Sequence, residues 1–243
     1  MKRSNLAIFA ILLLVFANGC SSSSSNNPTY PQVNYVTGGT EIYYSQTLDK
    51  NTGQPTPGSG DTITSVVVET GIAYQGMTGV TAIQNTHTNP VSVDTTYIAQ
   101  SNGNYWHYNY GLELLNGNSA VLSFANGGKP INGGWVLQAE FSAASGTTWI
   151  GMDTTLTLTI VAAAPLTDTA TETIDSSIAV GSSQVSVKHS MHSVYLNAGL
   201  VQASIPIDTY VSATDGSVLD IFHPTSLEGN PTPGKITILL STK

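Results

Sequence analysis

The chain has 243 residues, of which only 9% are charged, and its formal net charge is −8. The two basic residues of the first 19 positions, Lys2 and Arg3, are followed by a sequence with 5 Lys, no Arg and 15 Asp and Glu, a net charge of −10. Nucleic acids and phosphate groups are bound by clustered Lys and Arg, so this composition predicts no nucleic-acid partner. The length is enough for one large β domain or two small ones.

The first 20 residues have the pattern of an export signal. A short positive head precedes an unbroken apolar run at residues 6–17, which ends shortly before Cys20, the single cysteine of the chain. The run is too short to span a membrane, which needs about 18 or more apolar residues. We therefore expect residues 1–19 to be a signal peptide. An ordinary secretory signal with a chance cysteine is the alternative interpretation.

The sequence Ala17-Asn18-Gly19-Cys20 resembles the lipobox of bacterial lipoproteins. The resemblance implies cleavage by signal peptidase II before Cys20, a diacylglycerol thioether on its sulfur and a fatty acid such as palmitate on its amino group. Several acyl chains anchor a protein stably to a membrane. Residues 20–39 are then a Ser-rich tether, and the protein is lipid-anchored in the cell envelope. Ser21 resembles the sorting signal for the outer membrane, in a host that has one.

Residues 40–243 have the pattern of a single all-β domain. Short alternating runs are separated by Gly, Asn, Asp and Pro, and no amphipathic helix is evident. Ile42 and Tyr44 begin the first predicted strand, a long loop covers 49–61, and the later strands are expected at 62–69, 80–83, 91–99, 104–115, 119–125, 134–143, 154–161, 171–180, 184–196, 200–212, 218–223 and 236–240.

One polar and one apolar face on each strand is typical of antiparallel sheets. We therefore predict an antiparallel meander that forms a curved sheet or half-barrel. The succession of strands, with Val66 to Tyr74 leading into a glycine turn and Trp106 and Tyr108 in mid-sheet, loosely resembles lipoprotein-carrier-like half-barrels. One or two immunoglobulin-like β-sandwiches are the alternative.

Alternation along 104–114 predicts an aromatic face on the sheet. Trp106, Tyr108 and Tyr110 should share it with Leu112 and Leu114, whereas Tyr105, His107, Asn109 and Glu113 should face water. In 135–142 the same reasoning adds Trp135, Leu137 and Phe141 to the apolar face. Such a stripe forms either the core of the sheet or the wall of a ligand site, where it would bind an apolar ligand or stack on sugar rings. The candidate ligand face is Trp106, Tyr108, Tyr110, Trp135 and Phe141.

Catalytic and metal-binding motifs are not found in the sequence. It has no Gly-x-Ser-x-Gly, no His-Glu-x-x-His, no P-loop and no cysteine pair. His189 and His192 are three residues apart on a predicted strand, so they should point to opposite faces, one half-buried and one at the surface. Asp168, Glu172 and Asp175 are expected at a solvated edge or turn. We therefore expect neither a metal nor another cofactor, and no enzymatic activity.

Three functions are compatible with this sequence. The first is a non-enzymatic envelope lipoprotein whose sheet binds an apolar ligand or a lipidated protein partner. The second is a structural or adhesive surface module, and the third is a hydrolase of glycans or peptides. An open concave face would favour the first, two fully packed sheets the second, and two carboxylates across a cleft the third.

Overall fold

The computed structural model describes residues 32–110, 134–156, 164–198, 201–227 and 230–243. All of the regular structure in these residues is β, as predicted from the alternation, and no helix occurs among them. The strands are β1 (Thr40–Leu48), β2 (Asp61–Tyr74), β3 (Met77–Thr88), β4 (Val91–Ser101), β5 (Asn104–Tyr108), β6 (Trp135–Glu140), β7 (Thr148–Leu156), β8 (Ala164–Val180), β9 (Ser183–Ala198), β10 (Val201–Ser212), β11 (Gly216–Phe222), β12 (Thr225–Leu227), β13 (Asn230–Thr232) and β14 (Gly234–Thr242).

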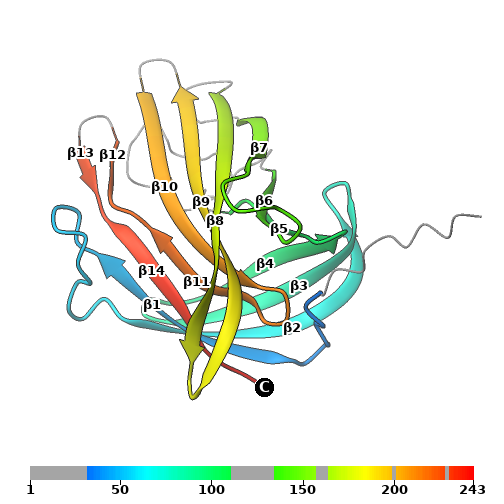
Figure 1. The fold of residues 1–243 in the computed structure, drawn as a ribbon. Coiled ribbons are helices and arrows are strands. Elements are labelled where there is room, and N and C mark those ends of the chain that lie inside the picture. The colour runs from blue at the N-terminus through cyan, green and yellow to red at the C-terminus, as the bar shows by residue number, and fades with distance from the viewer. Residues whose placement is uncertain (1–31, 111–133, 157–163, 199–200, 228–229) are drawn as a thin grey trace, which may run out of the picture.

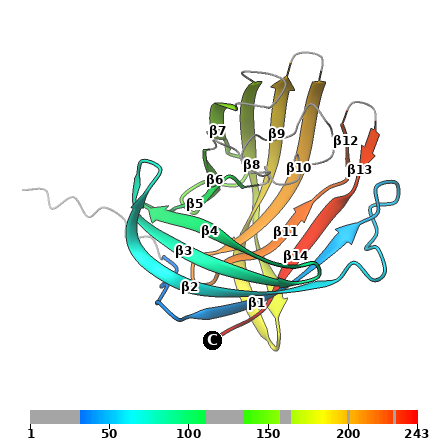
Figure 2. The ribbon, with the colours of Figure 1, turned by 180° about the vertical axis from the view of Figure 1, so that it is seen from behind.

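Twelve of these strands form one antiparallel sheet in the order β6-β5-β4-β3-β2-β1-β14-β11-β10-β9-β8-β7. Strands β1–β6 form one meander and β7–β11 another, and the pairing of the first strand with the last, β1 with β14, joins them. Strands β12 and β13 form a separate short hairpin. The curved single sheet is therefore confirmed, and the alternative of packed sandwiches is not what the chain forms (Figures 1 and 2).

The two edge strands of the curved sheet, β6 and β7, are close neighbours in sequence. Strand β6 ends at Glu140 and β7 begins at Thr148, and the short connection between them can span at most about 25 Å. Two side chains from β9 and β10 contact the main chain of β6. Nε2 of His192 lies 3.0 Å from the main-chain oxygen of Gln138, and the Thr209 hydroxyl donates a hydrogen bond to the same oxygen at 3.3 Å. The sheet is thus nearly closed into a barrel.

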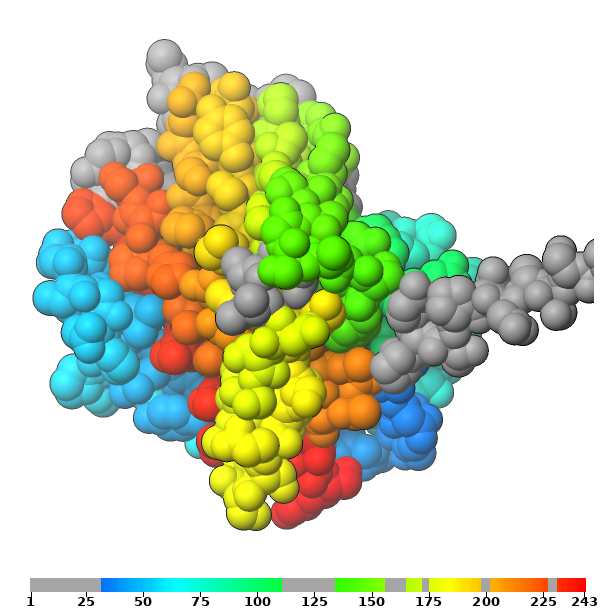
Figure 3. Space-filling model, in the orientation of Figure 1, coloured from blue at the N-terminus to red at the C-terminus, as the bar shows by residue number. Residues whose placement is uncertain are grey.

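Two clusters of buried side chains fill the inside of this sheet. The first surrounds Tyr105 and consists of Val33, Val67, Ile83, Ile98, Tyr105, Ala139 and Val211, with Tyr35 and Phe141 packed against it. The second contains Val187, Val218 and Leu239, where the tip of the β8–β9 hairpin lies over β14 (Figure 3). Burial of such apolar area is the main stabilising contribution to the fold.

The packed body begins before the boundary that the sequence suggested. Val33 is only 9% exposed and belongs to the first cluster. Its main-chain N–H donates to Oε1 of Gln100 at 2.8 Å, and Nε2 of Gln100 donates back to its carbonyl at 3.1 Å. The expected boundary at residue 40 therefore falls inside the body. Several predicted features lie outside the described residues. They are residues 20–31 of the proposed tether, the predicted strand at 119–125, and Leu112, Glu113 and Leu114.

Tyr105 and Trp106 of β5 face the opposite way to the sequence prediction, and the neighbouring strand β6 contains a β-bulge. Tyr105 pairs with Ala139 but Trp106 pairs with Leu137, so Gln138 is an extra residue in β6. The bulge shifts the alternation in β6 only, and the faces of β5 follow its own uninterrupted alternation. Tyr105, only 2% exposed, is in the core, whereas Trp106 is half-buried on the opposite face. The prediction that Tyr105 faces water is wrong.

Candidate functional site

A cavity of about 670 Å³ opens on the inner side of the curved sheet. Its volume lies in the range of small-molecule sites, about 300–1,000 Å³. Strands β1–β5, β11 and β14 all contribute residues to its wall. Side chains alternate between the two faces of each strand, and those on the inner face are available to line the cavity. The wall combines aromatic rings, among them Tyr35, Tyr43, Tyr105 and Phe222, with carboxyl, amide and imidazole groups.

Glu41 and three tyrosines form one polar part of this wall. The Tyr43 hydroxyl donates to Oε2 of Glu41 at 2.8 Å, and the hydroxyls of Tyr35 and Tyr105 lie 2.8 Å apart. Burial raises the pKa of Glu41 to about 7, although the hydrogen bond from Tyr43 acts in the opposite direction. Burial also raises the pKa of all three tyrosines, so their hydroxyls remain protonated and can donate hydrogen bonds at neutral pH.

Asp220 on β11 is the centre of a second polar part. Its Oδ1 accepts hydrogen bonds from the Tyr110 hydroxyl at 2.6 Å and from Nε2 of Gln138 at 3.1 Å, and its Oδ2 accepts one from the Ser217 hydroxyl at 2.6 Å. Burial raises the pKa of this carboxyl, and these bonds and the nearby His192 offset only part of that effect. Asp220 therefore binds a proton more readily than an exposed aspartate.

His107 on β5 faces the same cavity and has no such partner to stabilise its charge. Burial lowers the pKa of its imidazole to about 4, and the charge of Asp94 offsets this only in part. Its ring lies 5.1 Å from that of Tyr110. At neutral pH His107 is therefore a neutral aromatic part of the wall.

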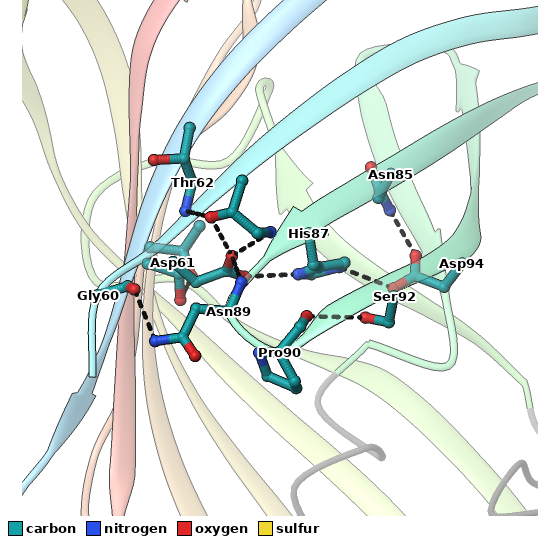
Figure 4. Close-up of polar contacts among 12 residues, drawn as sticks. Gly60, Asp61, Thr62, Asn85, His87, Asn89, Pro90, Ser92 and Asp94 are labelled. Atoms are coloured by element: carbon teal, nitrogen blue, oxygen red, sulfur yellow. Dashed lines mark hydrogen bonds and ion pairs between the residues drawn. The ribbon is translucent and has the colours of Figure 1, made fainter. Parts of the chain in front are cut away.

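A line of polar side chains crosses β2, β3 and β4 on the wall (Figure 4). His87 lies between two carboxylates, with Nδ1 2.6 Å from Oδ2 of Asp61 and Nε2 2.9 Å from Oδ2 of Asp94. Asn85 donates to Oδ1 of Asp94 at 2.7 Å and accepts a bond from the Ser65 hydroxyl at 2.7 Å. Burial raises the pKa of Asp61, but hydrogen bonds from His87, Asn89 and Thr88 outweigh it and leave that pKa lowered.

A further buried pair lies beside the cavity, between β8 and β9. The side chains of Asp168 and His192 have no exposed surface, and Oδ2 and Nδ1 are 2.7 Å apart. The expectation that Asp168 lies at a solvated edge is therefore wrong. The expectation that one of His189 and His192 lies at the surface is also wrong, because the side chain of His192 is fully buried and that of His189 is 17% exposed. His189 is half-buried, stacks on Tyr210 and lies 2.8 Å from Oδ1 of Asp208. Buried polar groups such as these are stable inside the sheet because each has a hydrogen-bond partner on another strand.

Metal-binding geometry is absent from the part of the chain that the structure describes. Oδ2 of Asp208 also bonds to Nε2 of His223 at 2.6 Å, so His189 and His223 share one carboxylate. No group of three or more His, Cys, Asp or Glu among these residues is arranged to hold a metal ion. No helix in the same residues is long and apolar enough to cross a membrane.

The residues of the predicted ligand face do not form one surface. Tyr110 bonds to Asp220 inside the cavity, and Phe141 packs against the Tyr105 cluster. Tyr108 also lines the cavity, and its ring and that of Trp135 form an aromatic group with the rings of Tyr74 and Tyr97, which stack at 3.7 Å. Trp106 contributes to neither group. Cys20 lies outside the described residues.

The acidic residues of the cavity were missed in the sequence analysis, although their positions carry a signal. Asp220 lies between Val218 and Phe222 in the alternation, and both of these are buried. A carboxylate within a run of inward-pointing apolar residues indicates a polar interior. Glu41 alternates with Tyr43 and Ser45 in the same way. This signal was available in the sequence at 218–222.

Comparisons with known proteins identify relatives by fold only. No family model matches the sequence, and a search of curated proteins finds no match. Among solved structures, a putative lipoprotein from Parabacteroides distasonis is similar, with a TM-score of 0.54 and 9% identity over 88% of this chain and 99% of that one. A putative exported protein with a YmcC-like fold from Bacteroides fragilis has a TM-score of 0.55 and 10% identity over 88% of this chain and all of that one. At these identities the chain shares their fold.

Proposed function

We propose that the protein is a non-enzymatic lipoprotein of the cell envelope, anchored in the membrane by lipid on Cys20. The lipobox-like sequence at residues 17–20 supports the anchor. The fold is shared with one protein described as a lipoprotein and one described as exported, which is consistent with an envelope location. Ser21 after the cysteine favours the outer membrane in a host that has one.

Labelling with palmitate tests the anchor. Cys20→Ser should abolish incorporation of labelled palmitate and release the protein from the membrane fraction, because the sulfur and the processed amino terminus are the attachment points. Ser21→Ala, one residue further on, should retain the label. Incorporation of label into Cys20→Ser at the wild-type level would contradict the proposal.

The body of this lipoprotein holds a small molecule in the cavity of the curved sheet. The observation that carries this proposal is the cavity of about 670 Å³, in which aromatic rings and polar groups from distant strands converge. Its wall is aromatic and polar together, so the ligand combines an apolar or ring-shaped part with hydrogen-bonding groups. This modifies the expectation of a purely apolar ligand.

The surroundings of two histidines, His87 and His192, support binding over catalysis by these residues. Each ring nitrogen of His87 faces a carboxylate oxygen, and His192 is held between a carboxylate and a carbonyl oxygen. A general base needs a ring nitrogen free to accept a proton from a nucleophile. Neither His87 nor His192 offers one.

A substitution that fills the cavity tests the binding function. Thr96 on β4 lines the cavity, whereas Val93 on the same strand does not line it and is exposed. Thr96→Trp should displace a bound small molecule, and Val93→Trp should leave it in place. Native mass spectrometry of the protein extracted from envelopes of the expressing cells would detect the ligand as added mass. The same spectrum for wild type and both variants would contradict a ligand in the cavity.

A further inference from the structure

The carboxylates of the cavity lack a matching set of cations. Glu41, Asp94 and Asp220 line it together with a single lysine, Lys235. Asp94 is bonded to His87, but within the described residues neither Glu41 nor Asp220 forms an ion pair. Their hydrogen-bond donors are uncharged tyrosine, serine and glutamine side chains. A buried carboxylate without a cation loses much of its hydration energy, and a positive ligand would offset that loss.

His192 does not supply the missing charge to Asp220. Its Nδ1 lies 2.7 Å from Asp168, and its Nε2 is directed at the Gln138 carbonyl. Any positive charge on this imidazole is therefore already paired with a carboxylate that has no exposed surface. Lys235 lies at the beginning of β14, where it pairs with Phe222 of β11 and with Thr47 of β1.

An unpaired acceptor on the cavity wall indicates that the ligand is a hydrogen-bond donor. The side-chain oxygen of Asn109 is buried and has no hydrogen-bond partner among the described residues. The residue lines the cavity and has a left-handed backbone, with φ of 58°. A buried acceptor without a donor costs about 1–3 kcal/mol. A ligand with N–H or O–H groups would satisfy it, whereas a hydrocarbon or an anion without such groups would not.

The aromatic rings of the wall suit the same ligand. Tyr35, Tyr43, Tyr105 and Tyr110 line the cavity with Phe222. The faces of such rings attract cations, and the attraction increases when both partners are removed from water. They also provide flat surfaces for an aliphatic or sugar ring. Carboxylates, an unpaired acceptor and aromatic rings are therefore present in one cavity.

We propose that this cavity binds a small organic cation with a primary ammonium group, of which an amino sugar is one example. The inference rests on the proposed function, because it identifies the class of molecule that the cavity holds. The ammonium group binds near Glu41 and Asp220, and the rest of the ligand packs on the tyrosine rings. A neutral molecule of the same shape binds more weakly because it leaves the carboxylates without a counter-charge.

Glucosamine and glucose test this proposal, since they differ only in an ammonium or a hydroxyl group on one carbon. Both are titrated calorimetrically into the full lipidated protein in a detergent without a sugar headgroup. Glucosamine should bind at least about tenfold more tightly than glucose. Glu41→Gln and Asp220→Asn keep the side-chain shape and remove the charge, so each should weaken glucosamine binding about tenfold and leave glucose unchanged. Glu69→Gln removes an exposed charge from β2 and should change neither affinity.

Three results would overturn the inference: equal affinities for the two sugars, no glucosamine binding at tens of millimolar, or an equal loss in Glu69→Gln. If Asp220→Asn does not fold by circular dichroism, Glu41→Gln alone decides, because Glu41 has fewer partners. Equal affinities that Thr96→Trp abolishes would refute the ammonium ligand while leaving a ligand-binding cavity in place. The two proposals therefore fail in distinguishable ways.

Discussion

Asp168 and Asp175 lie on the same strand, β8, and a comparison of the two tests the buried polar interior directly. The side chain of Asp168 has no exposed surface and bonds to His192, which is also fully buried. The side chain of Asp175 is 81% exposed and lies 2.9 Å from Nζ of Lys188. Removing one partner of a buried pair of an acid and a base costs about 3–5 kcal/mol because the other group remains buried without its partner. An exposed pair contributes about 0–1 kcal/mol.

We expect Asp168→Ala to lower the free energy of unfolding by about 3 kcal/mol, near the bottom of that range. The reason is that Oδ1 of Asp168 has no hydrogen-bond partner among the described residues, so its removal also relieves a desolvation penalty. Asp175→Ala should change the free energy by less than about 0.5 kcal/mol. Urea unfolding followed by tryptophan fluorescence measures both. A loss below about 1 kcal/mol in Asp168→Ala would refute the buried pair.

The pH dependence of stability and the face assignment of β5 give two more predictions. The pKa of Glu41 in the folded state is raised to about 7, so the folded state binds more protons than the unfolded state between pH 4.5 and about 7. The free energy of unfolding therefore falls as pH rises through this range, by roughly 3 kcal/mol at most. The folded pKa of His107 is lowered to about 4, so between about 4 and 6.5 stability rises with pH. Urea midpoints should therefore rise from pH 4.5 to 6.5 in Glu41→Gln and fall in His107→Asn; parallel profiles would contradict both assignments. Tyr105→Ala should cost about 3–5 kcal/mol and Trp106→Ala clearly less, and the reverse order in urea unfolding would place the core on the other face of β5.

The strand pattern could be predicted from the sequence because alternation depends on local residues alone. Runs such as Gln202 to Asp208 show one polar and one apolar face, and β10 forms there. The register of β5 against β6 could not be predicted in the same way. The bulged Gln138 has a carbonyl oxygen that is contacted by His192 and Thr209, from strands far away in the sequence. Alternation contains no information about such contacts.

The candidate site was missed for a related physical reason. We assumed that polar residues face water, which assigned His107 to the outside and treated Asp168 as solvated. In a nearly closed sheet the inner face can hold polar side chains, provided that each finds a partner from another strand. Those partners, such as Tyr110 for Asp220, are 110 residues apart and are brought together only by the fold.

A crystal structure of the protein soaked with glucosamine would locate the ligand directly. We predict density in the cavity of the curved sheet, with the amino nitrogen within hydrogen-bond distance of the carboxylate of Glu41 or Asp220 and the sugar ring against a tyrosine. Density only on the outer surface of the molecule, or an amino group directed away from both carboxylates, would contradict a cavity that recognises an organic cation.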